Sequence, residues 1–276
     1  MSEMRKYEDM YEFSYEMRHR FLEIFTRMGF GHVTSAFSLT EILGSLYLKV
    51  MNYCTEEPGG ENRDRLVISK GHGAGMLFPI FESVGYFTPE EMDEMLRIGG
   101  SYERLQQLFY PGFEFYGGSL GQGLGMAAGM ALGAKLNRES WHTYCILGDA
   151  ECYEGSVWEA ALFAGQRQLN NLVVIVDRNA LGCSEFTENM LPLEPFAMKW
   201  EACGWETVTV DGHCYEELIP VLQESRHNRS AHPLAVIART VKGKGLEHLY
   251  DKPLMHGYVP KSAEEIEIAF KNLKKY

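Results

Sequence analysis

Two short apolar runs, TYCIL at 143–147 and LVVIV at 172–176, flank the segment GSVWEAALFAGQRQ at 155–168. The second run is fully apolar and rich in β-branched residues, which is typical of a parallel strand covered on both faces. The pattern of the segment between them indicates a helix, so the sequence predicts a strand–helix–strand unit here. Further apolar runs at 207–210 and 234–238, with a helical pattern at 216–225 between them, continue the alternation. The sequence therefore predicts an α/β fold, a parallel sheet with helices on both faces.

Periodicity and capping signals predict helices outside this unit. Residues 10–28 carry apolar side chains at helical spacing. Ser38, with Glu41 three residues later, predicts a capping box for a helix that ends near residue 50. Thr88, followed by a proline and two acids, predicts another helix start. Residues 55–65 are charged and Gly-rich, so we expect a loop there.

Composition excludes several classes of function. The chain has 276 residues with no repeat and no linker-like tract, so we expect a single domain over residues 1–276. A formal net charge of −12 argues against nucleic acid and anionic membranes as partners. The six cysteines show no Cys-x-x-Cys or zinc spacing, no apolar stretch is long enough to span a bilayer, and the charged N-terminus does not resemble a signal peptide. These features predict free thiols and a protein of the reducing cytoplasm.

Polar residues follow the two strands of the central unit. Gly148 and Asp149 come directly after the first strand, and Asn179 comes shortly after the second. Parallel sheets bind ligands at the carboxyl ends of their strands. A carboxylate and an amide oxygen there suit Mg²⁺ shared with a phosphate, and a glycine lets the backbone approach closely. From these residues alone, Asp149 as a helix cap and Asn179 as a turn residue stay an open alternative.

Five segments in chain order carry a resemblance to the transketolase family. Gly148-Asp149, followed about thirty residues later by Asn179, resembles its thiamine-diphosphate motif. The others resemble its N-terminal Gly-His, its "NRDR…S.GH" segment, its "G.LGQG" loop and the close of its first domain. In this chain they are Gly31-His32, residues 62–73, residues 118–123, and residues 242–245 with His256-Gly257. The resemblance implies a thiamine-diphosphate-binding fold of the diphosphate type.

The same resemblance implies roles for particular residues. Mg²⁺, or another divalent cation, would be held by Asp149, Asn179 and the backbone carbonyl of Leu181. The catalytic residues would be His32, His72 and His256, although a surface or core position is the ordinary alternative for any histidine. The cofactor-binding residues would be Gly118, Leu120, Gly148, Asp149, Ala150, Glu154, Asn179 and Leu181. Chemistry alone does not distinguish these histidines from the others in the chain; their place in the motifs does.

Other matched positions keep alternatives open. Glu154 and Glu159 match acids at the family's dimer interface, but exposed acids near a helix N-terminus are an equal alternative. Leu120 matches a position that packs on the cofactor ring. Gly125, Gly129 and Gly133 recur every fourth residue in a helical segment, for which we expect tight packing in the core.

The resemblance also implies a split enzyme. Transketolases transfer a two-carbon ketol unit from a ketose to an aldose, and a glutamate of a second α/β domain activates the cofactor. This chain has one Gly-Asp…Asn motif and no room for that domain. We therefore expect a partner chain that carries the pyrimidine domain, in a heterotetramer of two copies each. The apolar contact surface is expected among Phe109, Tyr110, Phe113, Phe115, Tyr116, Trp158 and Phe163.

Two departures from the family pattern concern the substrate. Residues 102–115 contain no histidine where the family usually aims one at the donor's hydroxyls, and Val33 replaces a usual proline. A sulfosugar or branched-sugar phosphate is therefore an open alternative to a pentose phosphate donor. The competing functions are an alpha-type subunit of another thiamine enzyme such as a 2-oxo acid dehydrogenase, a piece of a 1-deoxyxylulose-phosphate synthase, and a non-catalytic cofactor-binding remnant.

Overall fold

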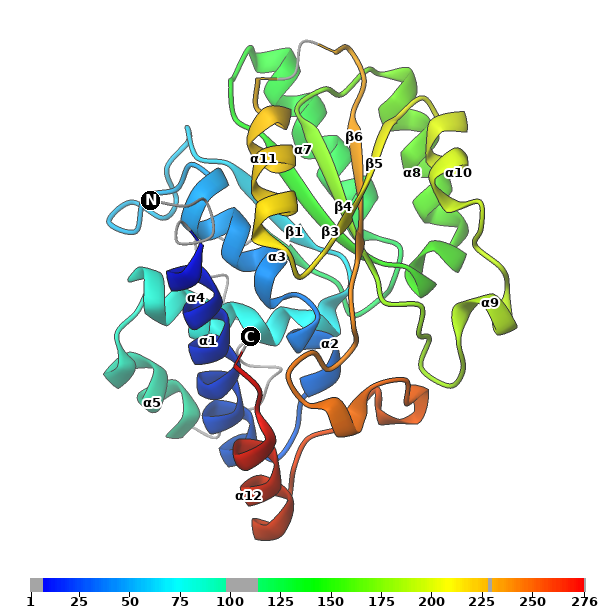
Figure 1. The fold of residues 1–276 in the computed structure, drawn as a ribbon. Helices are drawn as coiled ribbons and strands as arrows, with labels where there is room; N and C mark the ends of the chain where they lie inside the picture. The colour runs from blue at the N-terminus through cyan, green and yellow to red at the C-terminus, as the bar shows by residue number, and fades with distance from the viewer. Residues whose placement is uncertain (1–6, 98–113, 228–229, 276) are drawn as a thin grey trace.

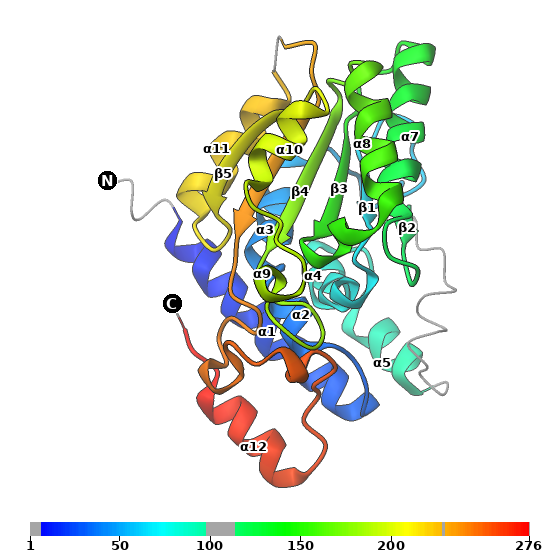
Figure 2. The ribbon, with the colours of Figure 1, turned by 90° about the vertical axis from the view of Figure 1, so that its right-hand side faces the viewer.

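Among the described residues, six parallel strands form a sheet at the centre of the chain, which can be followed in Figures 1 and 2. The computed structural model describes residues 7–97, 114–227 and 230–275. Across the sheet the strands follow the order β2 (Phe115–Tyr116), β1 (Arg65–Ile68), β3 (Thr143–Gly148), β4 (Leu172–Arg178), β6 (Leu234–Arg239) and β5 (Glu206–Asp211). The longest helices are α1 (Glu8–Met28), α7 (Gly123–Asn137), α8 (Gly155–Gln166) and α11 (Tyr215–Ser225). Shorter helices are α2 (Val33–Phe37), α3 (Thr40–Ser45), α4 (Leu77–Val84), α5 (Pro89–Arg97), α9 (Thr187–Met190), α10 (Phe196–Ala202) and α12 (Ala263–Asn272).

The central strands are buried on both faces because successive side chains point to opposite sides of the sheet. In β3, Tyr144 and Ile146 pack into the core that includes α1, α3, α4 and α11. Cys145 and Leu147 pack into the core that includes α7, α8 and α10. Figures 1 and 2 show these two groups of helices on opposite sides of the sheet. The predicted fold class is confirmed.

The strand–helix–strand unit is formed by β3, α8 and β4, as predicted. The helical patterns at 10–28 and 216–225 correspond to α1 and α11, and the runs at 207–210 and 234–238 to β5 and β6. The sequence did not predict β1 and β2, which have four and two residues. Segments of that length are too short to show a period of their own.

The predicted capping box at Ser38 is wrong, whereas the helix start predicted at Thr88 is confirmed: the Glu91 N–H donates to the Thr88 hydroxyl, and α5 begins at Pro89. The Ser38 hydroxyl donates to the Asp177 carboxylate at 2.7 Å and to the Ser35 carbonyl. Glu41 pairs with Arg18 instead of capping a helix. The helix expected from Ser38 to about residue 50 is formed by α3 and a π-helical turn at Leu46–Val50, and it is preceded by α2, which ends at Phe37. A long-range polar contact has overridden the local signal.

The expectation of tight core packing for the glycine repeat is also wrong. Alanines of α7, including Ala127 and Ala131, face the core and are fully buried. Gly125 and Gly129 are exposed, and a Cβ built on Gly125, Gly129 or Gly133 would meet nothing within 4 Å. The glycines therefore lie on the outer face of α7.

Two residues expected at a partner surface, Phe115 and Trp158, also contact the core of this chain. Phe115 and Trp158 are partly buried against the core that includes α7 and α8. The Trp158 indole donates to the Cys152 carbonyl at 2.7 Å, and its ring lies 5.4 Å from that of Trp200. Phe163 is 39% exposed, in agreement with the expectation. Residues 109, 110 and 113 lie outside the described residues.

The cysteines are free thiols, as predicted. Cys145 and Cys152 are buried, and burial raises the pKa of both thiols well above the ordinary value. Cys54 and Cys183 are exposed. Among the described helices, none combines the length and the apolar character needed to cross a membrane.

Candidate functional site

The carboxyl ends of β3 and β4 open onto a cavity of about 340 Å³. The two strands pair in parallel with Gly148 opposite Asp177, so the residues that follow them emerge side by side. Asp149 from the end of β3, and Asn179 and Leu181 from the end of β4, line this cavity. The structure thus brings together the three residues predicted as metal ligands, at the edge where parallel sheets bind ligands.

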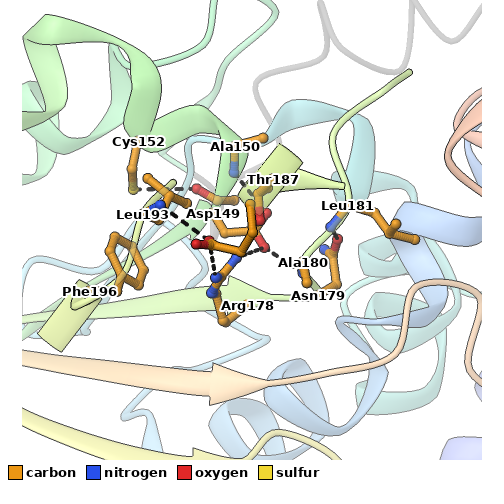
Figure 3. Close-up of polar contacts among 12 residues, drawn as sticks. Asp149, Ala150, Cys152, Arg178, Asn179, Ala180, Leu181, Thr187, Leu193 and Phe196 are labelled. Carbon is orange, nitrogen blue, oxygen red and sulfur yellow. Dashed lines mark hydrogen bonds and ion pairs between the residues drawn. The ribbon is translucent and has the colours of Figure 1, made fainter. Parts of the chain in front are cut away.

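Asp149 is buried and held by three donors (Figure 3). One carboxylate oxygen accepts from the Ala150 N–H at 2.7 Å. The other accepts from the Ala180 N–H at 2.6 Å and from the Arg178 guanidinium at 3.1 Å. Burial and the charge of Asp177 raise the pKa of Asp149, and Arg178 and the two N–H donors offset part of that rise. The carboxylate is therefore fixed in position before any ligand arrives.

Asn179 and Leu181 contribute neutral oxygens. The Asn179 side-chain oxygen accepts from the Leu181 N–H at 3.1 Å and keeps a second lone pair. Within the part of the chain that the structure describes, no three His, Cys, Asp or Glu side chains are placed to hold a metal ion. A divalent ion here would therefore depend on a carboxylate together with amide and carbonyl oxygens, a set that Mg²⁺ accepts.

A buried ion pair joins β1 to β4 beside the cavity. Lys70, which follows β1 and lines the cavity, donates to Asp177 near the end of β4. Thr240 and Ser38 donate to the same carboxylate. Burial acts to raise the pKa of Asp177, but Lys70 and the two hydroxyls outweigh it and the pKa is lowered. Asp177 is therefore ionised at neutral pH, and Lys70 has its counter-ion inside the protein.

A second lysine lies in the same cavity. The Lys242 ammonium is 2.9 Å from His256 Nδ1 and donates to the Gly182 carbonyl at 3.1 Å. It also lies 3.4 Å from the Leu181 carbonyl. Burial and the nearby Lys70 lower the pKa of Lys242 to about 8, so most copies are still charged at pH 7. The cavity thus combines oxygen ligands with a cationic wall, which suits an anion bound through a divalent metal.

The three predicted histidines lie together, and two of them, His72 and His256, line this cavity. The ring of His72 lies 4.7 Å from that of His256 and 5.5 Å from that of His32. Burial, with Lys70 and Lys242 nearby, lowers the pKa of His72 to about 2 and that of His256 to about 3. The same causes lower the pKa of His32, whose buried Nδ1 has no hydrogen-bond partner among the described residues. All three rings are therefore neutral at pH 7 and able to donate or accept a hydrogen bond.

Glu151 attaches the Gly-rich loop to the end of β3. One of its oxygens accepts from the Gly121 N–H at 2.8 Å and from the Ser69 hydroxyl, and the other accepts from the Gly148 N–H at 3.0 Å. Gly121 has a φ of +82°, and a Cβ there would lie 2.6 Å from side-chain atoms of Glu154, so the turn requires glycine. The loop therefore holds Leu120 in the wall of the cavity.

Other predicted residues lie farther out. Ala150 lines the cavity, but Gly118 and Glu154 are exposed and do not. Glu159 is exposed on α8. The cofactor contacts of Gly118 and Glu154, and the interface role of both acids, stay predictions. Most of the region that lacks a histidine lies outside the described residues.

The sequence did not single out several residues that shape the site. Lys70, Lys242 and Glu151 were present in recognised motifs, yet a motif does not reveal burial. Asp177 and Arg178 belong to a strand whose first five residues are apolar, and their charges at its end were the available signal. A charged residue at the end of a buried strand needs a buried partner. This rule could have identified Asp177 and Arg178 as residues that shape the site.

Comparison with known proteins agrees with this site. The family described as "Transketolase, thiamine diphosphate binding domain" matches residues 15–274. The chain is 35% identical over 236 residues to the 6-deoxy-6-sulfo-D-fructose transketolase subunit SqwG of Clostridium sp. (strain MSTE9), covering 85% of this chain and 86% of that one. It is 34% identical over 256 residues to an apulose-4-phosphate transketolase subunit of Phocaeicola vulgatus, covering 93% and 90%.

The fold is also found in a solved transketolase structure. The crystal structure of transketolase from Campylobacter jejuni superimposes with a TM-score of 0.80 at 28% identity, over 95% of this chain and 43% of that one. The chain thus spans most of the length of the two subunits but less than half of the single-chain enzyme.

We expect the rings of His72 and His256 to stay neutral between about pH 5 and pH 8. An unfolded histidine binds a proton below about pH 6.5, whereas the folded rings do so only near pH 2 and pH 3. The unfolded chain therefore binds more protons below pH 6.5, and stability should fall as the pH drops below that value, by at most about 1.4 kcal/mol per pH unit for His72. NMR titration of the imidazole carbon-bound protons tests the protonation. Urea unfolding at about pH 7 and pH 5, compared with His72→Gln, tests the stability; a His72 midpoint near pH 6 would contradict the burial argument.

Proposed function

Because this chain belongs to the transketolase family, we propose that it is the subunit that binds the diphosphate and metal of thiamine diphosphate in a two-chain transketolase. The observation that supports this most directly is the cavity at the ends of β3 and β4. It joins Asp149, Asn179 and the Leu181 carbonyl to a wall formed by Lys70 and Lys242. Oxygen ligands beside buried cations suit a phosphate-bound divalent ion.

In this proposal Asp149, Asn179 and the Leu181 carbonyl hold Mg²⁺ or a similar divalent cation. The fit rests on donor chemistry. Asn179 has a free lone pair, and the Asp149 carboxylate is already oriented by Arg178 and by the Ala180 N–H. Fixed ligands lose little freedom when the ion binds. The Lys242 ammonium, 3.4 Å from the Leu181 carbonyl, is close enough to contact an anion on the metal.

The cofactor, when bound, supplies the carbon chemistry by stabilising negative charge on the two-carbon unit. The residues of this chain bind and orient the sugar substrates and move protons. His72 and His256 line the cavity, the ring of His32 lies next to both, and all three rings are neutral. A neutral imidazole can donate a hydrogen bond to a sugar hydroxyl at one nitrogen and accept one at the other. We propose that they hold the hydroxyls of the ketose donor and the aldose acceptor and carry protons between them.

A partner chain completes the site in this proposal. Two relatives that match this chain over most of its length are themselves described as transketolase subunits. We propose that residues 1–276 form the diphosphate domain, that a second chain carries the pyrimidine domain, and that two copies of each assemble in the cytoplasm. Six free thiols are consistent with a reducing compartment.

The outer face of α7 and α8 supports an assembly. Met126, Leu162 and Phe163 are exposed there, 43%, 57% and 39% respectively. The glycines on the same face of α7 leave the backbone open to a closely packed neighbour. Exposed apolar side chains beside accessible backbone are typical of a helix contact between chains.

The donor sugar is left open by this site. One relative is described as acting on 6-deoxy-6-sulfo-D-fructose and another on apulose 4-phosphate. We propose a ketose phosphate or a sulfosugar as the donor. The family match disfavours a 2-oxo acid dehydrogenase subunit. A non-catalytic cofactor-binding role is separated from transketolase activity by the reconstitution described below.

We expect Asp149→Ala to abolish Mg²⁺-dependent binding of thiamine diphosphate by the assembled protein. The change removes the sole carboxylate of the proposed ligand set, so the loss should exceed the roughly 10–100-fold effect of removing an outer-shell partner. Isothermal titration calorimetry measures the affinity, and the melting temperature reports on folding. Asp93→Ala, which removes an exposed acid paired with Arg27, is the control and should bind as wild type does. Unchanged affinity in Asp149→Ala would place the metal elsewhere.

We expect the purified chain to show no ketol transfer alone and to gain it when the second chain is added. The diphosphate side can hold the cofactor, but the glutamate that activates it in the family belongs to a second α/β domain, which the partner would supply. The measurement is a coupled assay with ketose donors, aldose acceptors, Mg²⁺ and thiamine diphosphate, run on each chain and on the mixture. Turnover by this chain alone would refute the split enzyme. A mixture that binds the cofactor yet transfers nothing across a broad donor panel would favour the non-catalytic role.

We expect Phe163→Asp to weaken assembly without lowering the melting temperature of this chain. Phe163 is exposed, so a charge there should disturb a partner and not the core. An aromatic residue that anchors an interface costs more than about 1 kcal/mol when it is lost, or more than roughly fivefold in affinity. Phe115→Asp is the matched opposite and should destabilise the fold, because Phe115 packs against the core. Ile268→Asp, on exposed α12, should change neither. Sedimentation velocity and thermal unfolding together give both readouts, and equal assembly by Phe163→Asp would exclude this face.

A further inference from the structure

A buried charged triad lies behind the cavity and takes no part in the site described above. Arg18 of α1 and Glu41 of α3 form a two-pronged ion pair, with both nitrogen–oxygen distances at 2.6 Å. Both side chains are almost fully buried. His213, which follows β5, places its Nδ1 2.8 Å from the same Glu41 carboxylate. Burial acts to raise the pKa of Glu41, but Arg18 and His213 outweigh it and lower the pKa to about 2.

The other nitrogen of His213 faces the backbone next to Lys242. The Val241 N–H donates to His213 Nε2 at 2.8 Å. Because Nε2 accepts a hydrogen bond, the ring carries its proton on Nδ1 and donates it to Glu41. The chain of contacts therefore runs from Arg18 through Glu41 and His213 to the residue that precedes Lys242.

The backbone on the far side of Lys242 is also anchored. The Gly243 N–H donates to the Thr34 carbonyl at 2.9 Å, and Gly243 adopts a φ of +83° that favours glycine. The peptide that carries Lys242 is thus held at both ends, by His213 on one side and by α2 on the other. Its side chain extends from this point to His256 and to the carbonyls of residues 181 and 182.

We propose that His213 is a positioning residue: by accepting the Val241 N–H while Glu41 holds its ring, it sets the place of the Lys242 ammonium in the cavity. The inference rests on the proposed function, since it assumes that Lys242 binds the anionic part of the cofactor. A role in stability alone explains the triad less well. Taking an arginine and a glutamate out of water costs free energy that apolar packing of similar volume would avoid. A fixed geometry is what such a buried polar network provides.

Two substitutions separate the two hydrogen bonds of His213. The amide of Asn in His213→Asn can replace the Nδ1–H donor to Glu41 but leaves nothing at the position of Nε2. The side chain of Gln in His213→Gln can place its carbonyl oxygen near Nε2 and restore the acceptor for Val241. We expect His213→Asn to bind thiamine diphosphate and Mg²⁺ roughly tenfold more weakly, because it leaves a buried N–H without an acceptor. We expect His213→Gln to recover most of the affinity.

A double-mutant cycle with Lys242→Met distinguishes positioning from general destabilisation. If His213 acts through Lys242, adding His213→Asn to Lys242→Met should weaken cofactor binding little further, although each change alone weakens it. A merely structural role would lower the melting temperature in both backgrounds and give additive losses in affinity. The measurement is calorimetric titration of the assembled two-chain protein with thiamine diphosphate and Mg²⁺, with melting temperatures recorded in parallel.

Failure of the proposed function and failure of the inference about His213 give different experimental results. If the wild-type assembly binds no thiamine diphosphate, the proposed function fails, and this inference fails with it. If the wild type binds and His213→Asn binds equally well, or if the losses of the two changes are additive, only the inference about His213 is overturned. Weak binding by His213→Asn, recovery in His213→Gln and a non-additive cycle together support it.

Discussion

The arrangement of the site depends on one buried carboxylate. Asp177 near the end of β4 is fully buried and accepts from Lys70 after β1, Ser38 between α2 and α3, and Thr240 after β6. An unpaired charge in this position would be strongly unfavourable, so these segments must meet at the same point. The carboxyl edge of the sheet is thereby closed on one side by α2, and the cavity forms beside it. The same requirement explains why Ser38 does not cap a helix.

Charge is distributed unevenly between the surface and the cavity. The chain carries a formal net charge of −12, yet Lys70 and Lys242 lie in the wall of its cavity. Buried cations act on their neighbours through a medium of low polarity, which strengthens their effect. Burial is the main cause of the lowered pKa values of the three histidines, and these cations lower them further, so the rings are neutral. The site thus separates fixed cations that suit an anion from neutral groups that suit hydroxyls.

The layer formed by α7 and α8 has a buried inner face and an exposed outer face, which differ in composition. Its inner face carries small, fully buried residues such as Ala131 and Ala161, which let the helices lie close to β3 and β4. Its outer face carries exposed glycines with Leu162 and Phe163. The metal ligand Asp149 that we propose lies at the end of β3, just before α8. A partner on the outer face would therefore rest against the helices that immediately follow the Gly-rich loop and the end of β3.

The alternation of apolar runs and helical patterns was sufficient to predict the parallel sheet, because each run of β3 and β4 is long enough to require burial on both faces. The motifs placed Asp149, Asn179 and the three histidines. The topology explains why Asp149 and Asn179 converge, because the neighbouring parallel strands β3 and β4 end at one edge. The sequence by itself did not determine which charges are buried. These charges are joined by contacts across separations of 14 to 172 residues. The contacts link Lys70 to Asp177, Lys242 to His256, and Glu41 to both Arg18 and His213. Only the tertiary structure decided those pairings, because local propensity carries no information about which distant group will supply a buried counter-ion. It also decided that the glycine repeat lies on the outer face of α7, because local propensity does not determine which helix face meets the core.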